Sequence, residues 1–437
     1  MQRLLDGALG YIWPWEPGGV DIGGVEPKAG FVERRDGAVD VKLLVDDVRA
    51  AFDGINKAET VPEALLGAAD GVGLVVLDLV GQPGASIRFG GSMASTKTYR
   101  AKTLIATSAA LDTSRPSLSE AAIHLHGDKL FRWANTSAHE WSSRVNPETR
   151  LVESATLELK SGDPDVAVVP GIGELSVGTS WRGGDADQGL SVDLALEIGV
   201  RPPRPRRSHI VLGALGDLQV LLSALFNGFV VAGGAWARLP GSDTKGLLWN
   251  SVLMPDVARA PVTPPRKGFM PLVDLPDLGG AAGLGRWLRL AREHPRAMAP
   301  IANRWRRGQG TPELQLFQCA VALEYWVASH RRTTQWAHTT NLRPLAAARR
   351  VGHHFDNFVG DDHAWADRLW KNYNDLKHNP EASVDEYEVA LLAQSAYLLI
   401  LGLLLDRVAR TKRPSRRIFT GHQFEQLGSL IREHLRA

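Results

Sequence analysis

The sequence predicts an α+β multidomain protein, with a β-rich N-terminal domain followed by an all-α helical bundle. Hydrophobic residues alternate with polar ones in short runs up to about residue 200, and they recur every three or four positions from Leu284 onward. The 437 residues also exceed the length of a typical single domain. We expect a β domain over 1–200, a proline-rich connector with a small α/β segment over 201–280, and the helical domain over 281–437.

The first part of the chain consists of β-like runs bounded by Gly, Pro, Asp and Ser. Residues 73–80 form an apolar run that ends at a Gly-Gln-Pro-Gly turn, and residues 155–160 and 190–198 alternate between apolar and polar. Such alternation buries one face of a strand, as in an antiparallel sandwich or barrel-like sheet. The segment 201–207 contains three prolines and therefore predicts an extended connector.

The last part of the chain has the period of helices, with the clearest patterns at 284–291, 314–326 and 361–377. A further run, 389–405, is apolar nearly all round and approaches the roughly 17–25 residues of a membrane span. Acidic residues stand at both edges of this run, and no other segment resembles a span. We therefore expect a buried core helix and no membrane association.

The composition indicates the cellular compartment and the kind of partner to expect. A single cysteine, Cys319, excludes an internal disulfide and a multi-cysteine zinc site, and the chain start acquires an acid before any apolar run, so we expect a cytoplasmic protein. Residues 1–280 carry a net charge of −6 and residues 281–437 one of +8, with nine of the 13 histidines. A basic C-terminal part favours a polyanionic partner, although arginine-rich surfaces also occur without one.

The sequence contains no complete motif for dinucleotide binding, nucleotide triphosphate binding or metal binding. The loop 170–174 resembles the start of a dinucleotide-binding turn, but Ser176 replaces its third glycine, and no phosphate-binding loop of the Gly-Lys-Ser/Thr type is present. His353 and His354 are adjacent and should point apart, without a His-Glu-x-x-His arrangement. We expect no cofactor and no metal.

The sharpest local pattern is the segment 370–380, Trp-Lys-Asn-Tyr-Asn-Asp-Leu-Lys-His-Asn-Pro. Asn374 and His378 are four residues apart and share a helical face, and Lys371 lies three residues before Asn374. A lysine, an amide and an imidazole therefore project from one helix end. The simpler interpretation is a helix C-terminal histidine that interacts with the last carbonyl groups.

A family resemblance adds a second interpretation. The run 374–378 (Asn-Asp-Leu-Lys-His), on the third helix of an all-α domain, resembles the signature of HEPN domains, in which an arginine precedes a histidine by a few residues. Residues 317–324 are similar to the first long helix of the ApeA-like branch. Residues 118–127, closing at Trp133 or Trp141, are similar to a segment of the ApeA N-terminal domain, so the resemblance covers most of the chain.

This resemblance implies a bacterial anti-phage protein that cleaves RNA, often tRNA, without a metal. It implies a homodimer in which two HEPN domains form one composite cleft, and a β domain that senses a phage component. The alternative is a catalytically inactive HEPN-fold sensor or partner-binding module, in which the same residues cap a helix or form a dimer interface.

Within the resemblance, His378 would act as general acid or base, while Asn374 and Lys371 bind phosphate. The sequence departs from the family at the arginine, because either Tyr373 or Lys371 occupies its place, depending on the spacing used. Lysine supplies charge without the bidentate geometry of arginine, and tyrosine alone would stabilise the anion poorly. Arg368 is too far back unless the helix bends.

Three further residues complete the expected set. Glu324 and His330 belong to a neighbouring helix and would orient the catalytic groups, and Lys377 lies beside His378.

Overall fold

The computed structural model of the chain forms two compact units, each built from several segments. Unit 1 comprises residues 1–126, 170–216 and 231–260, and unit 2 comprises 127–169, 217–230 and 261–437. The structure describes residues 1–15, 26–45, 61–88, 94–108, 116–126, 130, 133–134, 137–183, 192–256, 263–330, 342–379, 381 and 384–436.

These units differ from the three predicted ranges. The strands around Trp236 and Trp249 pair with strands of the N-terminal β domain, so they join unit 1 instead of forming a separate connector segment. Residues 137–161, expected in the β domain, form a hairpin that belongs to unit 2. Local alternation predicts a strand but not its pairing partner, and the partner decides the unit.

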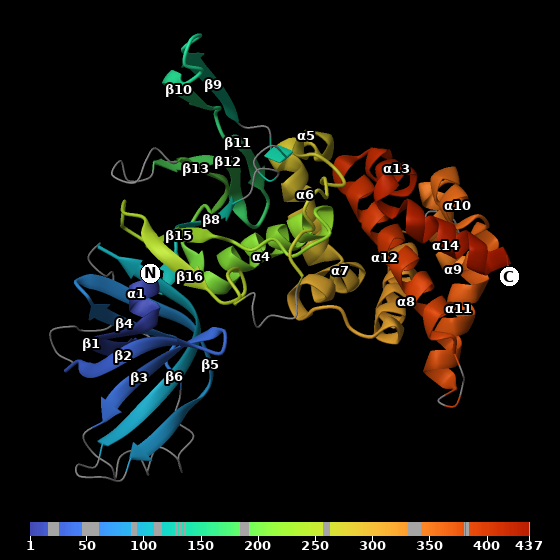
Figure 1. The fold of residues 1–437 in the computed structure, drawn as a ribbon. Helices are drawn as coiled ribbons and strands as arrows, with labels where there is room; N and C mark the ends of the chain where they lie inside the picture. The colour runs from blue at the N-terminus through green and yellow to red at the C-terminus, as the bar shows by residue number, and fades with distance from the viewer. Residues whose placement is uncertain are drawn as a thin grey trace. The chain divides into compact units, whose positions relative to one another are not determined.

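The first strands of unit 1 form a closed antiparallel barrel (Figure 1). Its strand order is β6-β3-β2-β1-β4-β5, and β5 pairs with β6 to close the ring. The barrel core is rich in Leu, Val and Ala, and the short helix α1 (Gln2–Leu5) adds Leu4 and Leu5 to it. The barrel strands are β1 (Asp6–Trp15), β2 (Lys28–Arg35), β3 (Ala38–Val45), β4 (Ala64–Ala69), β5 (Val72–Arg88) and β6 (Ala94–Thr107).

The sheet of unit 1 continues beyond the barrel from β6, in the order β16-β15-β8-β13-β12. All of these pairings are antiparallel. The strands are β8 (Glu120–His126), β12 (Gly173–Gly183), β13 (Val192–Arg201), β15 (Gly234–Arg238) and β16 (Gly246–Asn250), with a separate pair β7 (Ser117–Leu118) and β14 (Arg206–Arg207). The β-rich N-terminal region is therefore confirmed, with a barrel as its first part.

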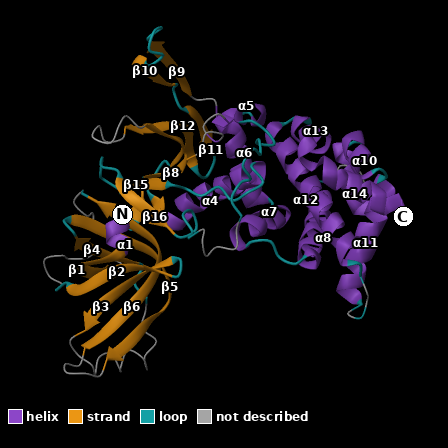
Figure 2. Cartoon of the chain, viewed as in Figure 1, coloured by secondary structure: helices purple, strands orange, loops and turns teal. Residues whose placement is uncertain are grey.

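Unit 2 combines a β-hairpin with a series of helices, drawn in purple in Figure 2. The hairpin consists of β9 (Ser137–Val145) and β10 (Val152–Ser161), and β11 (Asp165–Val169) follows. The carboxylate of Asp165 accepts a hydrogen bond from the backbone N of Ala281, at 2.7 Å. The helices are α5 (Leu275–Leu278), α6 (Gly280–Glu293), α7 (Pro295–Arg307), α8 (Pro312–Ser329), α9 (Leu342–Val351), α10 (His353–Val359), α11 (Asp362–His378), α12 (Glu386–Ala409), α13 (Arg413–Thr420), η3 (His422–Phe424) and α14 (Glu425–Arg436).

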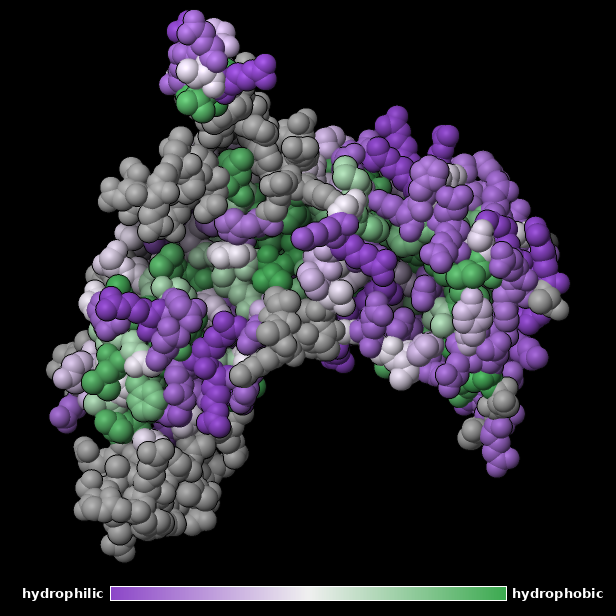
Figure 3. Space-filling model, in the orientation of Figure 1, coloured by the Kyte–Doolittle hydropathy of each residue, from purple (hydrophilic) through white to green (hydrophobic). Residues whose placement is uncertain are grey.

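Helix α12 is the central core helix of unit 2, in contact with α6, α8, α9, α11, α13 and α14. Among the described helices, two are long and apolar enough to cross a membrane by length and composition alone, α4 (Ser208–Leu225) and α12. The expectation that no segment besides 389–405 resembles a span was therefore wrong. The most apolar windows of α4 and α12 are 78% and 89% buried, which is the pattern of core helices. On the face shown in Figure 3, mostly hydrophilic side chains cover the helices of unit 2.

Candidate functional site

Helix α11 carries the predicted motif, and local signals fix both of its ends. The carboxylate of Asp361 caps the first turn by accepting from the backbone N of His363 and Ala364. The helix ends at His378, where the backbone N of Asn379 still donates to Asp375 O and Pro380 follows. The buried face of α11 includes Trp365, Ala366, Leu369, Asn372 and Tyr373.

The opposite face of α11 presents three of the predicted residues. Lys371 and His378 are exposed and Asn374 is half-buried, and the unbroken helix brings them onto one face at intervals of three and four. Within the described ranges, none of the three side chains has a hydrogen bond or ion pair. In particular, His378 makes no hydrogen bond to the terminal carbonyls, which the simpler interpretation would require.

Tyr373 lies on the buried side of the same helix. It is only 3% exposed, and its ring packs on Phe317 of α8 and on Trp370, with centroid distances of 5.2 and 5.0 Å. Lys377 extends over the ring, with its Nζ 5.4 Å from the centroid. Because Tyr373 is packed inside, Lys371 is the accessible one of the two residues that the HEPN resemblance would align with arginine.

Arg368 is held elsewhere. Its guanidinium Nη1 lies 3.3 Å from Oε1 of Glu388, at the start of α12. Its backbone O accepts from Nδ2 of Asn372, one turn later, in a regular helix. The helix does not bend in the way that would bring Arg368 to the motif.

Helices α8 and α11 run antiparallel. At one end, Phe317 packs on Tyr373. At the other end, α9 contacts both helices, because Arg350 donates to the backbone O of His330 and Arg349 hydrogen-bonds the ring of a histidine in the first turn of α11. Phe317 and His330 are separated by about 20 Å along α8, at roughly 1.5 Å per residue.

The structure therefore separates the predicted set into two ends of one helix pair. His378, Asn374 and Lys371 lie at the end marked by Phe317, which we call the motif end. His330 lies at the other end, and Glu324 pairs with Arg343 of α9. Neither Glu324 nor His330 orients the His378 set within one chain. Sequence reasoning placed both on a neighbouring helix, but not the direction in which that helix runs.

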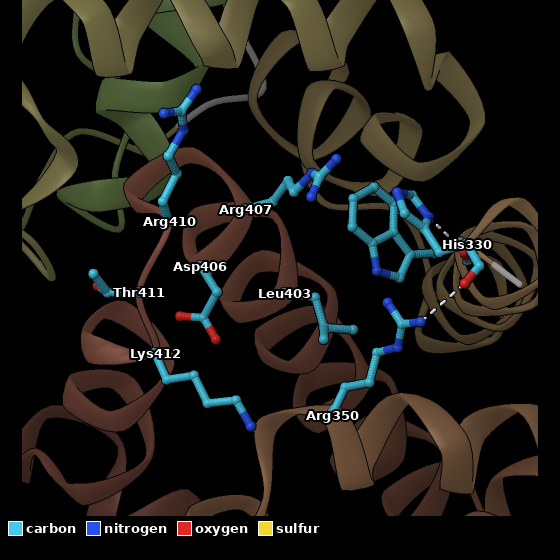
Figure 4. A pocket seen from close by; sticks show the side chains of 9 residues that line it. His330, Arg350, Leu403, Asp406, Arg407, Arg410, Thr411 and Lys412 are labelled. Carbon is cyan, nitrogen blue, oxygen red and sulfur yellow. Dashed lines mark hydrogen bonds between the residues drawn. The ribbon is translucent and has the colours of Figure 1, made fainter. Parts of the chain in front are cut away.

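An open pocket of about 590 Å³ lies at the His330 end of unit 2, and we call it the His330 pocket. Figure 4 shows Arg350 and Arg407 on the side nearest His330, and Asp406, Thr411 and Lys412 on the other. Four of its nine lining residues are cationic, and one is acidic. The lining residues are Trp326, His330, Arg350, Leu403, Asp406, Arg407, Arg410, Thr411 and Lys412.

The imidazole of His330 is fixed in orientation. Its Nδ1 donates to the backbone O of Trp326 at 2.9 Å, so the neutral ring keeps its lone pair on Nε2. Burial lowers the pKa of His330; the Trp326 carbonyl opposes this, and the nearby His294, Arg350 and Arg407 lower it further. His330 is thus held in its neutral form over a wider pH range than a free histidine.

Asp406 is the acidic residue of the pocket lining. Burial raises the pKa of Asp406 to about 6, although hydrogen bonds from Ser415 and the charge of Lys412 partly oppose the shift. The backbone N of Ser415 donates to Oδ1 at 2.9 Å. Near and below that pH the pocket therefore becomes still more positive.

One feature of the sequence indicates this pocket. Arg407, Arg410 and Lys412 directly follow the apolar run 389–405, so a cationic cluster stands at the C-terminal end of a core helix. Trp326, His330 and Arg350 come from distant segments, and only the fold brings them to this cluster.

In the described part of the chain, no group of three His, Cys, Asp or Glu residues could hold a metal ion. His353 and His354 do not point apart as predicted, because their ring centroids lie 3.9 Å apart. Cys319 is buried, which raises the pKa of its thiol to about 12 and keeps it protonated.

Comparison of the chain with family models, with curated proteins and with solved structures found no match. The resemblance to ApeA-like HEPN proteins therefore rests on the quoted residues. The N-terminal part of that resemblance includes Trp133 and Trp141. Trp133 is buried, and its Nε1 donates to Val273 O at 2.8 Å. The side chain of Trp141 lies outside the described residues.

Proposed function

We propose that this chain is an anti-phage protein that cleaves RNA, tRNA among its substrates, without a metal, using the motif end of α11. The observation that carries the proposal is the common face of Lys371, Asn374 and His378, of which Lys371 and His378 are exposed and Asn374 is half-buried. These side chains have no partner among the described residues. Exposed polar groups without structural partners are available for a substrate.

The chemistry requires a proton acceptor, a phosphate clamp and a proton donor. In the proposed step, the 2′-oxygen of a ribose loses its proton to an imidazole and attacks the adjacent phosphorus, and the bond from phosphorus to the 5′-oxygen breaks. The leaving 5′-oxygen takes a proton from a second acid. The products are a 2′,3′-cyclic phosphate and a 5′-hydroxyl, and no water is consumed.

Each chain supplies one motif histidine, so two proton-transfer groups require two copies of the motif. We therefore propose a homodimer in which two motif ends share a cleft, with His378 of each chain as acid or base. Lys371 and Asn374 would bind the phosphate by charge and hydrogen bonds. A further cleft at the start of α8, lined by Arg304 and Arg307 among others, adds positive charge to this end of α8.

The test is incubation of the wild-type protein and of His378→Ala with total tRNA in EDTA. Cleavage in the wild type, its loss in the variant, and new 5′ ends that a kinase labels without prior phosphatase treatment would support the proposal. His422→Ala is the matched control, because His422 is an exposed histidine of the same unit. Cleavage that survives in His378→Ala, or that stops in EDTA, would contradict it.

A second candidate function is a HEPN-fold module without catalysis. It is favoured by Tyr373, which occupies one of the two positions of the arginine and is buried. In that case, RNA stays intact with both proteins, including in infected cells, and His378→Ala protects cells from phage as well as the wild type does.

A further inference from the structure

The cleft at the start of α8, which we call the α8 cleft, is small and polar. Its volume is about 180 Å³, and Arg304 and Arg307 from the end of α7 line it. The amide side chains of Asn303, Gln309 and Gln318 also line it and make no hydrogen bonds among the described residues. No acidic residue belongs to its described lining. The cleft therefore offers positive charge and hydrogen-bond donors without an anion to match them.

The guanidinium of Arg304 is held in place without a counter-ion. It lies over the rings of Tyr397 and Trp305, 4.6 and 5.3 Å from their centroids. Arg304 is half-buried, and its Nε is enclosed, so the two Nη groups are the ones that a ligand can reach. Neither Arg304 nor the exposed Arg307 has an ion pair among the described residues. A cation partly withdrawn from water favours binding of an anion, and a stacked guanidinium presents its donors in a fixed plane.

Two exposed apolar side chains lie on α8 beside these cations. Leu314 lines the cleft and is 50% exposed, and Phe317, three residues later on the same face, is 37% exposed. Exposed apolar side chains that adjoin one another are typical of protein interaction surfaces. A ligand that contacts both parts of this surface needs an anionic group and an apolar group close together.

We propose that the α8 cleft docks an acidic segment of a partner protein. A Glu or Asp carboxylate occupies the cleft between Arg304 and Arg307, and a neighbouring apolar side chain of the partner packs on Leu314 and Phe317. Charge complementarity identifies the partner, because arginine clusters recognise acidic motifs through bidentate hydrogen bonds. The volume of about 180 Å³ lies below the roughly 300–1,000 Å³ of sites that enclose a whole small molecule, and it suits a single side chain.

This docking site does not rest on the proposed RNA cleavage. His378 does not line the cleft, and peptide binding is measured in the absence of RNA. The His378→Ala variant should therefore bind an acidic peptide as the wild type does, so that a failure of docking and a failure of cleavage are told apart.

The experiment is fluorescence anisotropy of the full chain, at fixed salt and in EDTA, with a labelled peptide Gly-Ser-Glu-Glu-Leu-Leu-Ser-Gly. Replacing both Glu residues of the peptide by Gln should weaken binding at least tenfold, because the carboxylates supply the recognition. Arg307→Gln should weaken binding of the Glu peptide about tenfold, the amount expected for one charge-assisted contact. Arg289→Gln is the matched control, since it removes an exposed charge of unit 2 outside the cleft.

Two more variants test the two parts of the surface. Leu314→Ser should weaken binding a few-fold with an unchanged melting temperature, because the side chain is exposed. Arg304→Lys should also weaken it a few-fold, because lysine keeps the charge and loses the planar fork. Absence of peptide binding, equal affinity for the Glu and Gln peptides, or equal affinity in wild type and Arg307→Gln would each overturn the proposal. So would single-stranded RNA that binds through Arg307 while the peptide does not, which would assign the cleft to RNA.

Discussion

The two ends of the α8–α11 pair differ in how their polar side chains are held. At the motif end, Lys371 and His378 are exposed on one helix and make no contact among the described residues that fixes them. At the His330 end, three helices contribute, the imidazole is anchored at Nδ1, and Trp326 stacks on it with ring centroids 3.9 Å apart. A preorganised site is expected at the second end, whereas the first needs a partner surface to become one.

Truncation at the His330 end should have the largest effect on stability. Trp326 is buried and contacts both His330 and His294, so Trp326→Ala leaves a large cavity in the wall of unit 2. We expect the free energy of unfolding to fall by about 3–5 kcal/mol. Denaturant titration measures this, and a loss below about 1 kcal/mol would show that this end is not the rigid one.

The buried side of the motif end should give the next largest effect. Tyr373→Arg places the family's arginine at one of its two candidate positions, but it forces a charge into a packed site between Phe317 and Trp370, beside Lys377. We expect a loss of about 2–3 kcal/mol and no gain in RNA cleavage. Increased cleavage by a folded Tyr373→Arg protein would instead assign the arginine position to residue 373.

Helix α11 shows which features of the candidate site the sequence could predict and which it could not. Helix α11 was expected at 361–377 and spans Asp362–His378, because its apolar period and the Asp361 cap are local signals. The burial of Tyr373 and the separation of His330 from His378 depend on how α8 and α11 are oriented. No local pattern contains that information.

The same distinction applies to unit 1. Individual strands were predicted by alternation, but the pairings of β3 with β6 and of β16 with β6 join residues far apart in sequence. Leu247 pairs with Ala106, for example. Long-range pairing of this kind set the unit boundaries, so the predicted limits of 1–200, 201–280 and 281–437 could not follow it.

An intermediate effect is expected from Asp406, with a defined pH dependence. Its folded-state pKa of about 6 lies above the ordinary 3.8, so the native state binds the proton more tightly. The wild type therefore loses stability as the pH rises from about 4 through 6, because the buried carboxyl becomes charged. Asp406→Asn keeps an oxygen acceptor for Ser415 N and avoids that charge.

We expect Asp406→Asn to be more stable than the wild type by about 2 kcal/mol at neutral pH, with the difference vanishing near pH 4. Unfolding midpoints measured across this range test it. A difference that does not change with pH would mean that the carboxyl is solvated, and that the His330 pocket is less enclosed than its lining suggests.

The smallest effect on stability should come from the exposed side of the motif end, where the effect on activity should be largest. His378→Ala and Lys371→Arg remove or change exposed side chains without described partners, so each should alter the free energy of unfolding by less than about 0.5 kcal/mol. Cleavage should vanish in the first, because no other group on that face can transfer the proton. Cleavage should rise in Lys371→Arg, because guanidinium binds a phosphate through two parallel hydrogen bonds where ammonium supplies a point charge.

Thermal melts and tRNA cleavage of the same preparations give both readouts. A Lys371→Arg protein that melts like the wild type yet cleaves no faster would mean that residue 371 does not contact the phosphate, and that the exposed face of α11 serves an interface.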